Sequence, residues 1–153
     1  MRLYFDCCCY NRPFDDQSQN RIHDESDAIL SLINRCQKDK LGIILGSTVL
    51  KMEIDQISDP AKKVKVLSLS KAISESIAYN DIIKKRAIEI QALTSIHEMD
   101  SLHIASAEFG NADIFISTDD KLLKSCQKIK TRLKVRVKNP VSFLAEVIEN
   151  DGY

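Results

Sequence analysis

The chain has 153 residues, 44% of them hydrophobic and 29% charged, which suits a single domain over residues 1–153 and excludes a disordered chain. Lysine plus arginine equals aspartate plus glutamate at 22 each, which excludes the strong basic charge that would by itself indicate nucleic-acid binding. The sequence has no apolar stretch near the length of a membrane span and no signal region, so we expect a cytoplasmic protein without membrane contact.

Strand-like and helix-like apolar patterns alternate along the first half of the chain. Short apolar runs between turn residues indicate buried strands, and apolar residues three or four positions apart indicate helices with one buried face. In order, the sequence predicts a strand at 2–6, a turn-rich loop at 10–16, a helix at about 22–36 ended by Gly42, a strand at 41–45, a helix that Ser47 caps, and a helix from Asp59-Pro60 to about Leu69.

The second half of the chain continues the alternation. It predicts a short strand at 76–79, a helix from 80 or 81 to about 93, a helix at 100–109, a strand at 113–117, a helix at about 121–128, a strand at 133–137 and a last helix from Asn139-Pro140 through Glu149. Strands that alternate with helices favour a parallel sheet covered on both faces. The predicted fold is therefore α/β, a three-layer α/β/α sandwich with a central, mainly parallel sheet of four or five strands.

Four acidic side chains lie where a predicted strand has just ended or where a helix turns its apolar face inward: Asp6, Glu53, Asp100 and Asp120. In an open parallel sheet, ligands bind at the carboxyl ends of the strands. Carboxylates repel one another at close range unless a cation joins them. If the four acids converge, they therefore predict a metal site.

Each acid also has a plain structural explanation. Glu53 could sit at the edge of its apolar stripe and reach solvent, and Asp100 could simply cap the helix that follows it. We expect one of Asp119 and Asp120 to cap the helix near Lys121, where only one cap is needed. The metal site therefore depends on the acids acting together.

Three of the five cysteines are consecutive, at Cys7, Cys8 and Cys9. Adjacent cysteines cannot form an unstrained disulfide or surround a tetrahedral zinc, and no Cys-x-x-Cys spacing occurs. We expect the cysteines to be reduced and mostly buried, as small packing residues.

Four motifs, taken in order, resemble those of the PIN domain family. They are Asp6 after the first strand, Ser47 followed by Glu53, the stretch 100–105, and Ser117-Thr118-Asp119-Asp120 after a strand. The match spans nearly the whole chain, and the loop at 8–16 is similar to that of a subgroup of bacterial and archaeal PIN proteins. The resemblance, to VapC-like ribonuclease toxins, implies a metal-dependent endoribonuclease that acts as the toxin of a toxin–antitoxin pair. It implies RNA as substrate and a protein antitoxin as partner, while a homodimer is compatible with the sequence.

The resemblance also implies roles for single residues. It makes the four acids the metal ligands and catalytic residues, with Thr118 orienting the cluster through its hydroxyl and Asp119 in a supporting position. Whether Asp119 or Asp120 is the direct ligand stays open. The chain departs from the family pattern at Cys7 and Cys8, where the family often has a small hydroxyl residue and then Asn or Ser.

The ligand types predict the metal and its chemistry. Hard oxygen ligands favour Mg²⁺ or Mn²⁺ over zinc, and we interpret His103 as a packing or supporting residue. Such an ion could bind the scissile phosphate and lower the pKa of a bound water.

Basic residues are concentrated in residues 121–138, which contain no acid. This segment could follow an RNA backbone, or it could be an edge strand with its bases turned to solvent. Arg12 is a separate candidate for a phosphate contact or for a partner's carboxylate.

Two other functions fit the sequence. One is a catalytically weak or inactive PIN-like module that binds RNA or a protein partner. The other is an unrelated metal-dependent phosphatase or phosphoryl-accepting domain, against which the absence of an Asp-x-Asp pair after the first strand counts.

Overall fold

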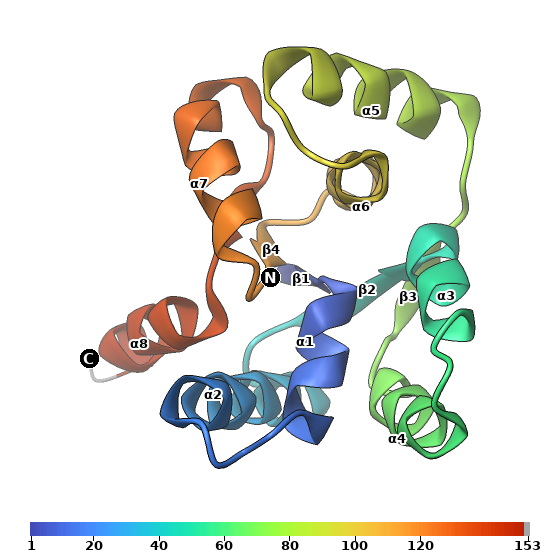
Figure 1. The fold of residues 1–153 in the computed structure, drawn as a ribbon. Helices are drawn as coiled ribbons and strands as arrows, with labels where there is room; N and C mark the ends of the chain where they lie inside the picture. Colours follow the sequence, from blue (N-terminus) through green and yellow to red (C-terminus); the bar gives the residue numbers. More distant parts are fainter. Residues whose placement is uncertain (152–153) are drawn as a thin grey trace.

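Five short strands form one parallel sheet in a computed structural model, which describes residues 1–151 (Figure 1). The strands are β1 (Arg2–Phe5), β2 (Ile43–Ser47), β3 (Glu75–Ile77), β4 (Ile114–Ile116) and β5 (Arg136–Lys138). Their order in the sheet is β3-β2-β1-β4-β5, and every neighbouring pair is parallel. The predicted parallel sheet is confirmed, with five strands.

The central strands are apolar on both faces because helices cover both sides of the sheet. Successive side chains of a strand point to opposite faces. Leu3 and Phe5 of β1 therefore belong to one core cluster, while Tyr4 between them belongs to the other. In β4, likewise, Ile114 and Ile116 face the first cluster and Phe115 the second.

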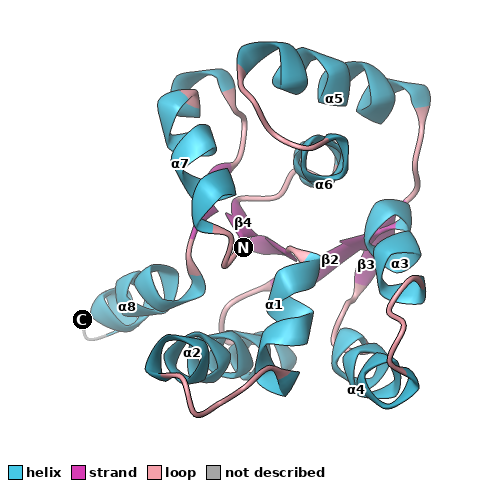
Figure 2. Ribbon diagram, viewed as in Figure 1, coloured by secondary structure: helices cyan, strands magenta, loops and turns pink. Residues whose placement is uncertain are grey.

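The helices form a layer on each side of the sheet (Figure 2). The first layer holds α1 (Cys7–Asn11), α2 (Asn20–Gln37), α4 (Pro60–Ser70) and α8 (Pro140–Asp151), and α3 (Thr48–Asp55) adds Leu50 and Ile54 to its core. The second layer holds α5 (Asp81–Leu93), α6 (Glu98–Phe109) and α7 (Asp120–Lys128). Together they make the predicted three-layer α/β/α sandwich. Across residues 1–151, every helix lacks the length or the apolar character that a membrane span requires.

Most predicted helix starts are confirmed by their caps. The Ser47 hydroxyl accepts a hydrogen bond from the backbone N–H of Leu50, and the Asp59 carboxylate caps α4 directly before Pro60. The Asn80 side chain caps α5 in the same way. These polar side chains accept backbone N–H groups that would otherwise lack partners at a helix start.

Four predictions of local structure were wrong. The expected loop at 10–16 contains the end of α1 and a 3-10 turn at Arg12–Phe14. Helix α2 ends at Gln37, not at Gly42; Gly42 instead has a φ of +146° and lies under Met1, whose carbonyl oxygen would be 1.9 Å from an added Cβ. Helix α6 begins at Glu98, so Asp100 is not its cap. The last strand begins at Arg136 and not at 133, because the N–H of Lys134 bonds to the Glu108 side chain and not to β4.

All five cysteines are free, as expected. Four of them are buried and Cys8 is partly exposed. The four buried cysteines serve as small packing residues, whereas the Cys8 thiol lies 3.5 Å from an Asp6 carboxylate oxygen and 3.5 Å from the Ser117 hydroxyl.

Candidate metal site at the ends of β1 and β4

The chain changes direction across the sheet at β1. It proceeds from β1 to β2 and β3 on one side, and then returns to place β4 and β5 on the other. The crevice outside the carboxyl ends of such neighbouring strands is where open parallel sheets bind ligands. Asp6 directly follows β1 and Ser117 directly follows β4, so the topology brings both residues to this crevice.

Asp6 is held rigidly at this edge. One carboxylate oxygen accepts a hydrogen bond from the N–H of Cys7 at 2.8 Å, and the other accepts one from the Ser117 hydroxyl at 3.0 Å. The residue is only 5% exposed. Burial raises the pKa of Asp6, and the nearby charge of Glu53 adds to this effect, while His103 and the two hydrogen bonds oppose it.

A chain of buried hydrogen bonds positions Glu53. The Tyr4 hydroxyl lies 2.6 Å from the Ser47 hydroxyl and 2.7 Å from Nδ1 of His103. Nε2 of His103 lies 2.6 Å from a carboxylate oxygen of Glu53. When the Glu53 carboxylate is ionised it only accepts hydrogen bonds, so Nε2 of His103 then donates in this contact and does not serve as a metal ligand. Burial by itself lowers the pKa of His103, but its bond to Glu53 and the neighbouring acids raise the pKa overall.

Asp6, Glu53 and His103 are close enough to surround one ion. Each offers a ligand atom, and the three atoms lie within 4.8 Å of one another. Because the His103 nitrogen is occupied by Glu53, the atoms that suit a metal are the carboxylate oxygens. Glu53 lies on the side of its helix that faces this group and is 34% exposed, so it can still reach solvent. An oxygen donor set of this kind fits Mg²⁺ or Mn²⁺.

Asp100 and Asp119 lie beside this group. Both line a small pocket of about 150 Å³. Burial, together with the charges of Asp6 and Asp119, raises the pKa of Asp100 to about 6, while the two nearby histidines, His103 and His97, oppose the shift. Asp119 is the cap of α7, because one of its oxygens accepts the N–H groups of Lys121 and Leu122. Three acids from three different elements thus influence one another at the same edge of the sheet.

Asp120, in contrast, points elsewhere. Its carboxylate is 57% exposed and forms two hydrogen bonds with the Arg21 guanidinium, at 2.7 and 2.8 Å. That guanidinium lowers the pKa of Asp120. Of the four acids predicted as ligands, the structure therefore brings Asp6 and Glu53 within 4.8 Å of each other. It places Asp100 near enough for the charge of Asp6 to raise its pKa, and Asp120 in a surface ion pair.

The hydroxyl that orients Asp6 belongs to Ser117 and not, as predicted, to Thr118. Within residues 1–151, the buried Thr118 hydroxyl has no hydrogen-bond partner, whereas Ser117 donates to Asp6 and accepts the N–H of Asp119. Ser117 and Tyr4 are the site residues that sequence reasoning missed. The available signals were a hydroxyl residue directly after a buried strand, and a phenol in a strand with otherwise apolar neighbours.

Arg12 forms ion pairs with two acids of the same chain. Its guanidinium lies 3.3 Å from Glu25, which is 1% exposed, and 3.5 Å from Asp15. These two acids already balance its charge. The prediction of a phosphate contact at Arg12 gains no support from this placement.

Comparisons with known proteins bear on the fold. No family model matches the sequence, and no curated protein matches it. A chain of the crystal structure of VapBC2 from Rickettsia felis, bound to a DNA fragment from their promoter, has a similar fold. The TM-score is 0.56 at 12% sequence identity, and the match covers 91% of this chain and 98% of that chain. At this identity, the likeness shows that the two chains share a fold.

Proposed function

We propose that this protein is a divalent-metal-dependent endoribonuclease that hydrolyses RNA phosphodiester bonds. The observation that carries the proposal is that ligand atoms of Asp6 and Glu53 lie within 4.8 Å of each other, with Asp100 near enough for the charge of Asp6 to raise its pKa. Acids gathered in this way destabilise the protein when no cation is bound. Their cost is therefore best explained by a Mg²⁺ or Mn²⁺ ion that they hold during function.

We assign the ligands to Asp6, Glu53, Asp100 and Asp119. Asp119 replaces Asp120 in this set because it shares a pocket with Asp100, while Asp120 is paired with Arg21. Bound Mg²⁺ or Mn²⁺ would supply an activated water and a counter-charge for the phosphate. The chain's own contribution is to hold the carboxylates in place.

Two side chains orient the ligands. The Ser117 hydroxyl fixes one oxygen of Asp6, and His103 fixes one oxygen of Glu53. The buried bond from Tyr4 to His103 in turn fixes the plane of the imidazole ring. Residues that orient metal ligands in this manner commonly change metal affinity or activity by about 10- to 100-fold when they are replaced.

We further propose that the protein acts as a toxin that an antitoxin protein neutralises. The PIN-like fold and its likeness to a chain of the VapBC2 complex support this assignment. A gene for a small DNA-binding protein next to the gene for this chain would support it further. Co-purification of the two products, with loss of RNA cleavage in the complex, is the direct test.

The test of the nuclease is metal-dependent cleavage of RNA. The purified protein should cut RNA with Mg²⁺ or Mn²⁺ and stop cutting when EDTA is added. Asp6→Asn should remove the activity while the circular dichroism spectrum stays unchanged, because an Asn side chain can still cap α1. If the wild type cuts no RNA with any divalent metal, the nuclease assignment fails.

A binding module without turnover is the second candidate. This candidate is favoured by the 2.6 Å hydrogen bond between His103 and Glu53, because the bonded oxygen of Glu53 is then not free to bind a metal. In that case RNA or a protein partner would bind with unchanged affinity in Asp6→Asn, and neither form would cleave RNA.

A further inference from the structure

Basic charge is concentrated in one segment of this electrically neutral chain. Residues 121–138 contain eight of the 22 lysines and arginines and none of the 22 acids. The rest of the chain therefore has fourteen basic residues against 22 acidic ones. A separation of charge on this scale creates a local positive potential despite the zero net charge.

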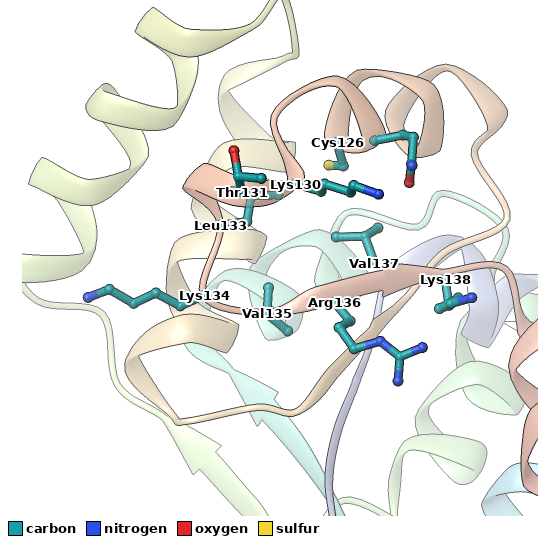
Figure 3. A pocket seen from close by; sticks show the side chains of 10 residues that line it. Cys126, Lys130, Thr131, Leu133, Lys134, Val135, Arg136, Val137 and Lys138 are labelled. Atoms are coloured by element: carbon teal, nitrogen blue, oxygen red, sulfur yellow. The ribbon is translucent and has the colours of Figure 1, made fainter.

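The structure divides this segment into two parts with different surroundings. In β5, the Arg136 guanidinium makes hydrogen bonds of 2.9 and 3.0 Å to Glu146 of α8, and the Lys138 amine lies 3.7 Å from the same carboxylate. Arg136 points away from α7 in Figure 3. The charge of the strand is therefore partly balanced within the protein, as suits an edge strand.

Helix α7 presents its lysines differently. Lys121, Lys124 and Lys128, which we call the lysine row, recur at helical spacing on one face and are all exposed, while Leu122 and Cys126 are buried on another face. Among residues 1–151, no carboxylate lies within ion-pair distance of these three amines. The row is thus free to bind a polyanion.

The lysine row connects the acidic site with a groove. At one end, Lys121 lines the small pocket that also contains Asp100 and Asp119. From Lys121 to Lys128 the helix rises by roughly 10 Å. Beyond the row, Lys130 extends across a groove of about 540 Å³ between α7 and β5, which Figure 3 shows from close by.

Helix stability alone does not explain this row. Cations are favourable near the last turn of a helix and unfavourable near the first, because of the helix dipole. Lys128 follows that preference, but Lys121 lies in the first turn of α7, next to its cap. A lysine at that end is better explained by its position beside the acidic pocket.

We propose that the lysine row and Lys130 bind the sugar–phosphate backbone of single-stranded RNA as it leaves the acidic site. The identity of this polyanion rests on the proposed function. The binding itself does not require cleavage, so it is measured separately from catalysis.

The test compares two triple variants that remove the same formal charge. K121Q/K124Q/K128Q neutralises the lysine row. K134Q/R136Q/K138Q neutralises both basic residues of β5 and Lys134, which lies two residues before the strand. A labelled oligouridylate is titrated in EDTA at several salt concentrations, and anisotropy gives the affinity. Circular dichroism checks that both variants fold, which is expected because these side chains lie on or near the surface.

In the row variant, loss of three phosphate contacts should make the plot of log binding constant against log salt concentration less steep by about 2, since each contact to a single strand contributes about 0.7 to its steepness. At low salt the affinity of the row variant should fall at least tenfold. The β5 variant should lose clearly less, because Glu146 already balances Arg136 and Lys138. Equal losses in both variants, no loss in the row variant, or no binding by the wild type would each overturn the proposal.

Polyglutamate of matched length is the last arm of the experiment. If it binds as tightly as the RNA and loses as much affinity in the row variant, the row belongs to an acidic protein partner and the proposal is wrong. If RNA binds through the row but is never cleaved, the nuclease assignment fails while this inference stands.

Discussion

Two neighbouring regions of this molecule hold aspartates in opposite electrostatic environments. In the crevice between β1 and β4, burial and the other acids raise the pKa values of Asp6 and Asp100. On the surface between α2 and α7, directly after Asp119 in the sequence, the guanidinium of Arg21 lowers the pKa of Asp120. The difference shows that the surroundings of a carboxylate, more than its position in a motif, separate a candidate ligand from a surface ion pair.

The largest effect is expected from a direct comparison of Asp119→Asn with Asp120→Asn. Asn caps helices as well as Asp does, so both variants should keep α7 folded. If Asp119 holds the metal, its replacement should lower RNA cleavage by more than about 100-fold, beyond the loss typical of residues that only orient ligands. Asp120→Asn should stay within about twofold of wild type. The reverse ranking in a cleavage assay would restore Asp120 as the ligand.

Removal of the hydroxyl that supports His103 should have an intermediate effect. Tyr4→Phe leaves Nδ1 of His103 and the Ser47 hydroxyl without their buried partner, which costs about 1–3 kcal/mol of stability. Because Glu53 is then less well oriented, affinity for Mn²⁺ should fall by about tenfold.

Calorimetric titration of Mn²⁺ separates this role from a purely structural one. His103→Gln, which keeps a donor but not the imidazole geometry, should weaken Mn²⁺ binding similarly. Unchanged Mn²⁺ affinity in both folded variants would show that the hydrogen-bond chain serves stability alone.

The smallest effect concerns the stability of the metal-free protein. Asp100 has a pKa of about 6 in the folded state, above its ordinary value of 3.8, so its ionisation opposes folding. This destabilisation is absent below pH 4, develops as the pH rises, and is complete above pH 6.

Asp100→Asn should therefore raise the melting temperature in EDTA by a few degrees at pH 7 and leave it unchanged at pH 4. Asp120→Asn provides the contrast, since loss of its partner Arg21 should lower the melting temperature slightly at pH 7. A lower melting temperature for Asp100→Asn at pH 7 would mean that its carboxylate stabilises the fold.

Much of the fold was predictable because it depends on local patterns. The apolar runs of β1 and β4 and the caps at Ser47, Asp59 and Asn80 specify their elements within a few residues. Helix α1 was missed because its five residues, three of them cysteines, show no clear helical period. The predicted position of the last strand was a few residues too early, because an alternating sequence does not reveal where pairing with β4 begins.

The site was predictable in part. Asp6 and Glu53 could be recognised because an acid after a buried strand or on an apolar helix stripe needs an explanation. The choice between Asp119 and Asp120 could not be made, because it depends on Arg21, which lies about a hundred positions away in the sequence. The same is true of Tyr4 and His103, which meet only through the packing of α6 on the sheet.

The most direct test of the central claim is diffraction from crystals of the protein soaked in Mn²⁺. The anomalous signal reports where the ion binds without any assumption about the substrate. We expect a peak within bonding distance of the carboxylate oxygens of Asp6, with Glu53, Asp100 or Asp119 completing the coordination, and no peak at Asp120. A crevice without Mn²⁺, or an ion bound at Asp120, would contradict the account.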